Sequence, residues 1–320
     1  MSLHVFANFV TSYGTAANNR AETEGNITTL QKLIWQGQTH TTVSAEAIRF
    51  ALRRRLAGME PNGCNRVWDE EARNNTWKDW NFTGWDEDNG KTFIDDDLLG
   101  FMTAEAAKAD GSDQPEGEGD KKQGQRREKG SANVRRAVLE VTRAISVTSW
   151  PGDVTFNAAS PGATPSAQKK GTNPVPYGTE VHATRYQYAI ALTPERLRDK
   201  SRAAKAIQAL CELGPVAGNH ARFLFDFSPD VVLFRLTDDP APRILYCFGT
   251  DDDGQTLHAR PLLARLQAGD IDPKELLLGT SDLKGALAES LRQAGILVDG
   301  VKKICQEAVK RINQRLGLGG

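Results

Sequence analysis

The 320-residue sequence has few cysteines, no long apolar run and no excess charge of either sign. Its four cysteines are scattered without a C-x-x-C pair, which argues against a zinc ribbon and a disulfide scaffold. No apolar run approaches the roughly 20 residues that a membrane-spanning helix needs, and the first residues show no signal-peptide pattern. We therefore expect a cytoplasmic protein without a membrane partner. Forty basic and 41 acidic residues nearly cancel, so any nucleic-acid surface must be local.

Signatures of catalysis and cofactor binding are equally scarce. The chain has no G-x-S-x-G, P-loop or G-x-G-x-x-G motif, and its five histidines form no H-x-x-x-H pair. Two runs of three aspartates, 95–97 and 251–253, resemble metal clusters, but successive side chains point in different directions. A two-metal site needs carboxylates that converge from separate elements, so both runs are interpreted as solvated turns. The sequence predicts no cofactor, no metal and no enzymatic activity.

The spacing of apolar residues predicts alternating strands and helices. A buried strand is expected at 3–10, and an amphipathic helix begins at the N-cap Ser44 and ends at Gly58. The later elements are strands at 134–150 and 182–193, a helix at 194–214, two strand runs within 223–237, and a strand at 243–249. The order strand, helix, strand, strand, helix, strand is that of an α+β, ferredoxin-like palm, the topology of the RNA-recognition module.

Insertions divide this pattern into four segments. They are the first part of the palm at 1–60, a finger-like insertion subdomain at 61–133, the rest of the palm at 134–250, and a C-terminal helical extension at 251–320 with helices at 281–295 and 299–316. The insertion carries four of the six tryptophans, so an aromatic-stapled subdomain is expected at 64–102 rather than a regular element. Residues 106–132 have almost no large apolar side chains and are predicted to be disordered.

A protruding thumb arm is expected at 150–181, between two predicted strands. This stretch is far longer than an ordinary hairpin loop, and long insertions of this kind are commonly functional. It carries Phe156, Tyr177 and the pair Lys169-Lys170, a mixture suited to stacking on bases while contacting phosphates. The alternative is a mobile surface loop without a partner.

The start of the helix at Ser44 is a candidate phosphate site, because a helix N-terminus presents unpaired N–H groups and a partial positive charge. Arg20, Lys32 and His40 precede it, and Arg49 and Arg53 follow one turn apart. The alternative is that the two arginines lie on a solvated helix face.

Two histidines beside predicted strands are further candidates for RNA contact. His182 is followed by Arg185, and His220 by Arg222. A hydrogen-bonded structural histidine is the more common role for either.

Several segments together resemble a known family. They are ANFVTSYGTAANNRAETEGN, THTTVSAEAIRFALRRRL, VTRAISVTSWPGDVTFNAASPGA, PVPYGTEVHATRYQYAIALTPERL and GNHARFLFDFSP, in this order. They are similar to the DevR-type CRISPR-associated autoregulators, the Cas-seven-type backbone subunits of type I Cascade complexes. The similarity covers most of the chain to about residue 250, and the I-B subtype is expected.

The resemblance implies a right-hand-like protein that polymerises head-to-tail on a CRISPR guide RNA and presents it to target DNA in antiviral defence. Other Cascade subunits would be further partners. The thumb would kink the guide, and palm contacts would come from Asn19 and Arg20 in the NNR loop and from Ser44, Arg49 and Arg53. Such a subunit grips phosphates and 2′-hydroxyls rather than base edges.

Two other functions remain open from the sequence. One is a DNA-binding transcriptional autoregulator, as the family's older name suggests. The other is a metal-dependent ribonuclease, since related type III subunits cut RNA with an aspartate in the loop before the first helix. The corresponding stretch here offers Glu22 and Glu24 but no aspartate, so no cleavage is expected.

Overall fold

The computed structural model describes residues 2–17, 23–86, 90–104, 132–162, 168, 174–216, 224–251 and 254–319. The stretch predicted to be disordered, 106–132, lies outside these residues except for Ala132. Among the described residues, no helix is both long and apolar enough to span a bilayer.

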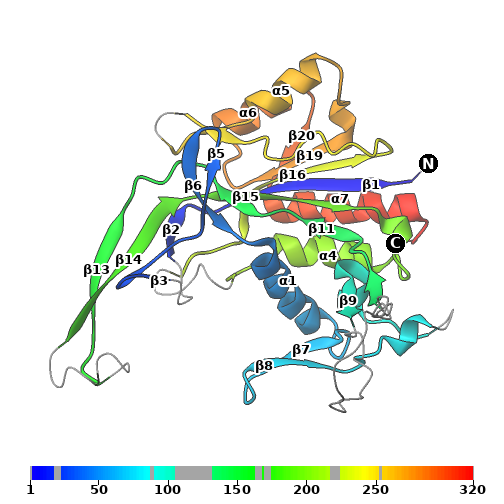
Figure 1. The fold of residues 1–320 in the computed structure, drawn as a ribbon. Helices are drawn as coiled ribbons and strands as arrows, with labels where there is room; N and C mark the ends of the chain where they lie inside the picture. The colour runs from blue at the N-terminus through cyan, green and yellow to red at the C-terminus, as the bar shows by residue number, and fades with distance from the viewer. Residues whose placement is uncertain are drawn as a thin grey trace, which may run out of the picture.

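A nine-stranded sheet forms the centre of this mixed α/β fold, in the order β20-β19-β16-β1-β15-β12-β6-β5, with β11 also paired to β15 (Figure 1). Strand β1, His4–Thr11, lies near its middle and pairs antiparallel with β15, Tyr186–Leu192, and β16, Pro229–Thr237. The other strands are β5 Lys32–Trp35, β6 Gln38–Val43, β11 Leu139–Val141, β12 Ala144–Ser146, β19 Leu276–Thr280 and β20 Leu297–Asp299. The predicted first strand is therefore confirmed.

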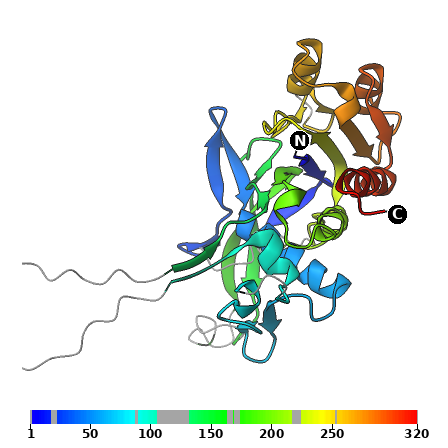
Figure 2. The same ribbon diagram turned by 90° about the vertical axis from the view of Figure 1, so that its right-hand side faces the viewer.

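Helices cover both faces of the sheet. Successive side chains of a strand point to opposite faces, so one strand contributes residues to both cores. Val5 and Phe9 of β1 belong to the core that includes residues of α1, Ala45–Met59, α4, Arg202–Cys211, and α7, Val301–Leu316. Phe6 and Val10 belong to a second core with residues of α5, Arg260–Gln267, and α6, Ala286–Gln293. Figure 2 shows the two helical layers on either side of the sheet.

Helix α1 begins as the sequence predicts. The Ser44 hydroxyl accepts a hydrogen bond from the backbone N–H of Ala47 at 3.2 Å, which satisfies one of the unpaired donors of the first turn. Ile48, Leu52 and Leu56 are fully buried, so the predicted apolar stripe faces the core. The helix does not end at Gly58 but continues to Met59.

The insertion contains more regular structure than expected. Its elements are β7 Arg66–Asp69, β8 Asn74–Trp77, η1 Thr83–Trp85, α2 Ile94–Leu99, β9 Phe101–Ala104 and β10 Ala132–Arg135. Aromatic contacts hold these elements together, as predicted. The rings of Phe82 and Phe101 stack with centroids 3.7 Å apart, and Trp77 meets Phe82 edge-on at 5.7 Å.

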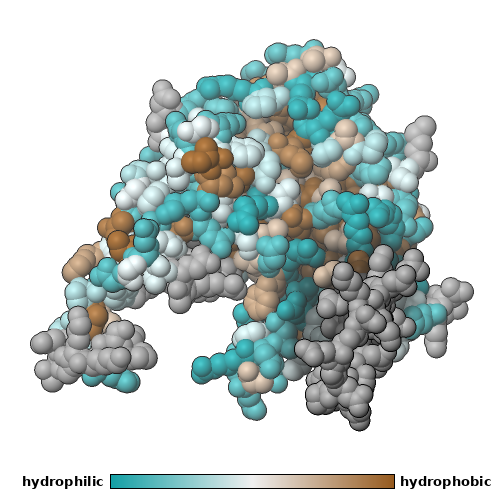
Figure 3. Space-filling view, viewed as in Figure 1, coloured by the Kyte–Doolittle hydropathy of each residue, from teal (hydrophilic) through white to brown (hydrophobic). Residues whose placement is uncertain are grey.

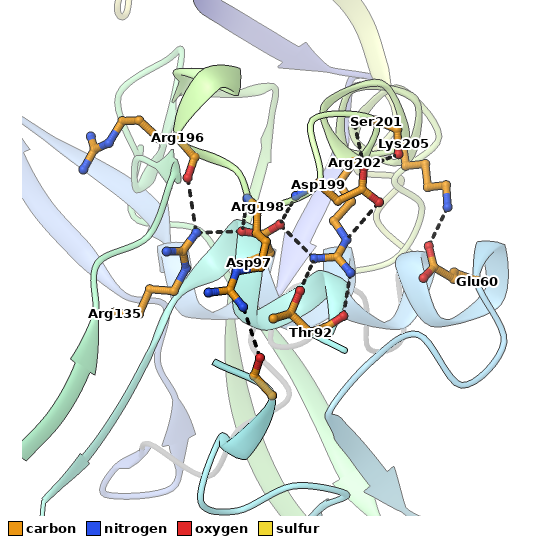
Figure 4. A network of polar contacts seen from close by, with 11 residues as sticks. Glu60, Thr92, Asp97, Arg135, Arg196, Arg198, Asp199, Ser201, Arg202 and Lys205 are labelled. Carbon is orange, nitrogen blue, oxygen red and sulfur yellow. Dashed lines mark hydrogen bonds and ion pairs between the residues drawn. The ribbon is translucent and has the colours of Figure 1, made fainter. Parts of the chain in front are cut away.

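The aspartate run at 95–97 is buried, so its interpretation as a solvated turn was wrong. All three side chains are at most 3% exposed on helix α2. Asp95 pairs with Arg53, and Asp97 pairs with Arg135 and Arg202, as Figure 4 shows for Asp97. Distant arginines offset the desolvation of these two carboxylates. In the second run, Asp251 lies in a turn and pairs with Arg260, whereas 252–253 lie outside the described residues.

The thumb arm is a β-hairpin that projects from the body in Figure 1. Strand β13, Val154–Ala159, pairs antiparallel with β14, Val175–Thr184, whose inner end also pairs with β2, Gly14–Ala17. Strand β4, Ile27–Thr28, adds to β14 in parallel, and β3, Thr23–Glu24, completes this smaller sheet. The strands on either side of residues 18–22 in the sequence, β2 and β3, therefore belong to the same sheet as the arm.

Several predicted elements differ from those observed. The strand at 134–150 is divided into β10, β11 and β12, and the helix at 194–214 into η2, Pro194–Arg196, and α4. The described residues 224–228 and 243–248 form no strand, although strands were predicted there. The short strand β17, Gly249–Thr250, begins just after the second range and pairs with β18, Leu257–His258. The C-terminal segment is not only helical. After η3, Pro273–Glu275, strands β19 and β20 join the central sheet, while α6 and α7 appear where helices were predicted.

Candidate nucleic-acid interface

The base of the arm borders a hollow in the molecular surface. Figure 3 shows this hollow between the β13–β14 arm and the lobe that carries α1 and β7–β8. Apolar side chains are exposed on this arm and near its base, with Phe156 80% and Tyr13 52% exposed. Leu224, beside the region 217–223, is 73% exposed. Exposed rings of this kind supply stacking surfaces for unpaired bases.

A buried polar cluster lies where the arm joins the main sheet. The hydroxyl of Thr41 is 2.7 Å from Nδ1 of His182 and 2.8 Å from the hydroxyl of Tyr186. His40 Nδ1 lies 2.7 Å from the carbonyl oxygen of Ser146. The cluster joins β6, β12, β14 and β15, so it fixes the direction in which the arm leaves the body.

The two histidines of this cluster are structural in the described chain. His182 is 1% and His40 7% exposed. Burial, followed by the neighbouring His40, lowers the pKa of His182 to about 4, so its ring is neutral at pH 7. A neutral buried ring does not attract a phosphate by charge. His40 and His182 were predicted to contact RNA, and the structure gives both side chains internal partners.

Lys32 is held at the same junction by an ion pair. Its ammonium lies 2.6 Å from Oε2 of Glu180 on β14 and 4.2 Å from the centroid of the Trp150 ring. Glu180 also accepts a hydrogen bond of 2.7 Å from the backbone N–H of Leu30. Lys32 thus ties β5 to the arm.

Arg185 makes a further internal pair. It donates to Oδ2 of Asp230 at 2.5 Å and to the carbonyl oxygen of Thr11 at 3.1 Å. Arg185, between β14 and β15, therefore connects this turn of the chain to the neighbouring ends of β16 and β1.

Two arginines of α1, Arg49 and Arg53, contact the insertion. Arg49 donates to the carbonyl oxygen of Leu99, and Nε of Arg53 lies 3.2 Å from Oδ2 of Asp95. Burial, followed by the charge of Arg53, lowers the pKa of Arg49. These arginines anchor α2, and Ser44 caps α1.

The remaining predicted residues are on the arm or outside the described chain. Phe156 is exposed on β13, and Tyr177 is half-buried on β14, opposite Asn157. Six of the predicted contacts lie outside the described residues: Asn19, Arg20, Lys169, Lys170, His220 and Arg222. The described strands that flank 18–22 belong to the sheet of the arm, because β2 pairs with β14, and β3 pairs with β4, which also pairs with β14.

Sequence reasoning missed the acidic partners of Lys32, Arg53 and Arg185. These partners lie 148, 42 and 45 residues away in the chain, so no local spacing reveals them.

Within the described residues, no group of three His, Cys, Asp or Glu side chains is arranged to hold a metal ion.

Comparison with known proteins identifies the family. The family model "CRISPR-associated negative auto-regulator DevR/Csa2" matches residues 10–214. A protein of Myxococcus xanthus (strain DK1622), named "CRISPR-associated protein Cas7/Cst2/DevR", is 59% identical over 318 residues, which cover 98% of this chain and 99% of that protein. The chain belongs to the DevR/Csa2 family. The resemblance noted in the sequence is thereby confirmed.

Solved structures share the fold of this DevR/Csa2 family member. A chain of a "CRISPR RNA-guided surveillance complex, pre-nicking" gives a TM-score of 0.56 at 13% identity and covers 97% of this chain and 100% of that one. A chain of another "CRISPR RNA-guided surveillance complex" gives 0.53 at 16% identity, with coverage of 96% and 99%. The shared architecture extends over nearly the whole length of each chain.

Proposed function

We propose that this chain is the guide-RNA-binding backbone subunit of a type I Cascade surveillance complex, of the I-B kind. The observation that carries the proposal is the 59% identity, over nearly the full length, to a protein named Cas7/Cst2/DevR. The fold shared with chains of surveillance complexes supports it further. Its partners would be the guide RNA, other Cascade subunits and, through the RNA–DNA duplex, target DNA. It would act in the cytoplasm without catalysis of its own.

The core of the subunit would be a ferredoxin-like palm. The neighbouring strands β16-β1-β15-β12 are antiparallel, and the chain passes through α1 between β1 and β12 and through α4 between β15 and β16. This order supports the split βαβ arrangement. The β19-β20 edge and the insertion would be additions to it.

The arm would act as the thumb that contacts the guide. Phe156 is exposed on it, and Lys169 and Lys170 follow in sequence toward its end. Together with Tyr177, and with Asn19 and Arg20 between β2 and β3 in the sequence, they would grip phosphates and stack on bases. His220 and Arg222 are further candidates.

The candidate residues with internal partners would have a positioning role. Lys32, His40, His182 and Arg185 hold the junction between the arm and the main sheet. Ser44, Arg49 and Arg53 hold α1 and the insertion together. They would shape the surface that carries the guide.

Copies of the chain would assemble head-to-tail along the guide. A net charge of -1 is compatible with close stacking, because a strongly basic subunit would repel its neighbour. Contacts between unlike surfaces that do not close into a ring generate an open helical filament.

Purification tests this proposal directly. When the protein is expressed with its CRISPR locus, small RNA of uniform length should co-purify with it. Protein free of RNA, or bound to RNA of random length, would contradict the proposal.

A DNA-binding autoregulator is the second candidate, favoured by the words "negative auto-regulator" in the family's description. Retardation of DNA from the protein's own promoter, unaffected by an excess of guide RNA, would support it. A ribonuclease would instead cut complementary RNA in the presence of Mg²⁺.

A further inference from the structure

A cleft between α1 and the β7–β8 hairpin is lined by three arginines, of which Arg54 and Arg66 form no ion pair with a described residue. It has a volume of about 230 Å³ and is lined by Phe50, Arg53, Arg54, Arg66, Trp68 and Asn75, among others. In Figure 1, α1 and β7–β8 lie on the opposite side of the hollow from the arm. The cleft therefore lies apart from the arm, whose residues are proposed to grip the guide.

Two of the guanidinium groups, those of Arg54 and Arg66, form no ion pair with a described residue. Arg54 is exposed and forms no hydrogen bond or ion pair with any described residue. The Nε of Arg66 is buried, and no described residue accepts a hydrogen bond from it. Its guanidinium carbon lies 5.3 Å from the centroid of the Trp77 ring, so an aromatic face supports its position.

The electrostatics of the cleft favour an anion. Burial, followed by the charge of Arg53, lowers the pKa of Arg66. Both causes disfavour the charged form of Arg66, while the charge of Asp95 partly opposes them. The negative charge of an anion placed between the arginines would favour the charged form further. Glu70 also lines the cleft but forms no ion pair with a described residue. Asp95 is already paired with Arg53. The cleft therefore lacks a full counter-charge among the residues that line it.

The other walls suit a nucleobase. The rings of Phe50 and Trp68 meet edge-on with centroids 6.2 Å apart and are both partly exposed. Asn75 supplies an amide that both donates and accepts hydrogen bonds. Guanidinium groups bind phosphate oxygens through paired N–H donors, and aromatic rings stack on any base.

We propose that this cleft binds one nucleotide of a single nucleic-acid strand, with its phosphate on Arg54 and Arg66 and its base against Phe50 and Trp68. This inference rests on the proposed function, because it assumes that the chain belongs to a complex that contains guide RNA. The same chemistry is offered by the guide RNA and by a DNA strand that is not paired with it. The experiment distinguishes these two sources.

The test compares Arg54→Ala/Arg66→Ala with a charge-matched control, Arg260→Ala/Arg292→Ala, in the assembled complex. The control arginines are exposed and paired on α5 and α6, across the sheet from α1. For each complex, the co-purified RNA is quantified, and binding of fluorescent oligo-dT without complementarity to the guide is titrated over a range of salt.

Loss of oligo-dT affinity with normal guide content supports a second-strand site. The slope of the logarithm of the association constant against the logarithm of the salt concentration should then become less steep by about 0.7 for each phosphate that no longer has an arginine beside it. Loss of guide content in the cleft variant alone assigns the cleft to the guide. Unchanged guide content and unchanged oligo-dT binding would overturn the proposal. Absence of guide RNA from the wild-type protein would instead refute the proposed function, independently of this variant.

A second variant separates stacking from charge. Trp68→Ala should weaken the binding of the same strand about fivefold or more, with no change in salt slope, because base stacking does not release counterions. If Trp68→Ala lowers the thermal unfolding temperature, Arg54→Ala alone keeps the test valid, because Arg54 is exposed and makes no described contact that folding requires. Unchanged affinity and salt slope in folded Arg54→Ala protein would then count against the site.

Discussion

Asp97 on α2 and Arg202 on α4 face each other across the boundary between the insertion and the palm, with Oδ2 and Nη1 2.8 Å apart. Arg135 donates to the other carboxylate oxygen at 2.6 Å, and the backbone N–H groups of Arg198 and Asp199 complete its shell (Figure 4). Asp97 is fully buried, so it accepts four hydrogen bonds at a place where water cannot substitute for any of these donors. Asp97 thereby adds a buried ionic tie between the insertion and the palm to the contacts that Arg49 and Arg53 make.

Replacing Asp97 should destabilise the protein strongly. Asp97→Asn removes the charge that pairs with Arg135 and Arg202 and leaves the buried Arg202 with only the longer contact of 3.8 Å to the exposed Asp199. Breaking a buried pair in this way costs about 3–5 kcal/mol. Urea unfolding measures the change, and Glu140→Gln, which affects only an exposed pair with Arg136, is the control. A decrease in stability no larger than in the control would refute the structural role of Asp97.

The ion pair between Lys32 and Glu180 should couple the arm to the body. A double-mutant cycle with Lys32→Met and Glu180→Gln should give a coupling free energy of about 0.5–3 kcal/mol, since the two groups are in direct contact. Each single variant should also make the arm more susceptible to limited proteolysis. Additive effects in the cycle would show that the pair does not hold the junction.

Two buried groups should give opposite pH dependences of stability. The pKa of His182 is lowered to about 4 in the fold from 6.5, so the stability it confers is complete above pH 6.5 and is lost as the pH falls toward 4. Burial, followed by the charge of Asp95, raises the pKa of Asp96 to about 7 from 3.8, so its contribution is complete below pH 3.8 and is lost as the pH rises toward 7.

Variants should separate these two contributions. Between pH 4 and 6.5, Asp96→Asn should make stability rise more steeply with pH than in the wild type, by up to about 1.4 kcal/mol per pH unit. His182→Gln should make it rise less steeply over the same range. Chemical denaturation at a series of pH values tests both, and identical profiles for the three proteins would contradict these assignments.

Charge on the arm and on the NNR loop should set the salt dependence of guide binding. Replacing Arg20, Lys169 and Lys170 by alanine should reduce the slope of log K against log salt by about 0.7 for each phosphate that these cations neutralise in the wild type. The folded stability should not change. The matched control replaces Arg260, Arg292 and Lys303, which are exposed and far from the arm. An equal slope in both triple variants would remove these residues from the interface.

Deleting residues 158–176 should leave a folded protein that assembles poorly. The central sheet does not include the end of the hairpin, so its cores remain intact. Without the thumb, guide RNA should bind more weakly, and ordered filaments should be absent from electron micrographs. Filaments of normal length and order would exclude the arm from assembly.

The parts of the fold that sequence predicts are those governed by local patterns. The run at 3–10 and the stripe of Ile48, Leu52 and Leu56 specify β1 and α1, because burial follows the period of each element. Strands β19 and β20 were missed because their short apolar runs lie between helices, and only pairing in space makes them strands.

The sequence predicted the arm as a projecting segment, but it did not predict the contacts of the individual candidate residues. The arm and its base were located from composition and from the resemblance to the DevR family. The roles of Lys32, Arg53 and Arg185 depend on carboxylates brought to them by the fold, and the burial of the aspartates at 95–97 depends on arginines contributed by other segments. Long-range ion pairs leave no spacing in the sequence from which to infer them.

Native mass spectrometry of the complex purified with its guide tests the central claim most directly. We predict a particle that contains several copies of the 35.0 kDa chain and one RNA. Collisional activation in the mass spectrometer should release the copies one at a time. A single 35.0 kDa chain without RNA, isolated under conditions in which the guide is present, would contradict the account.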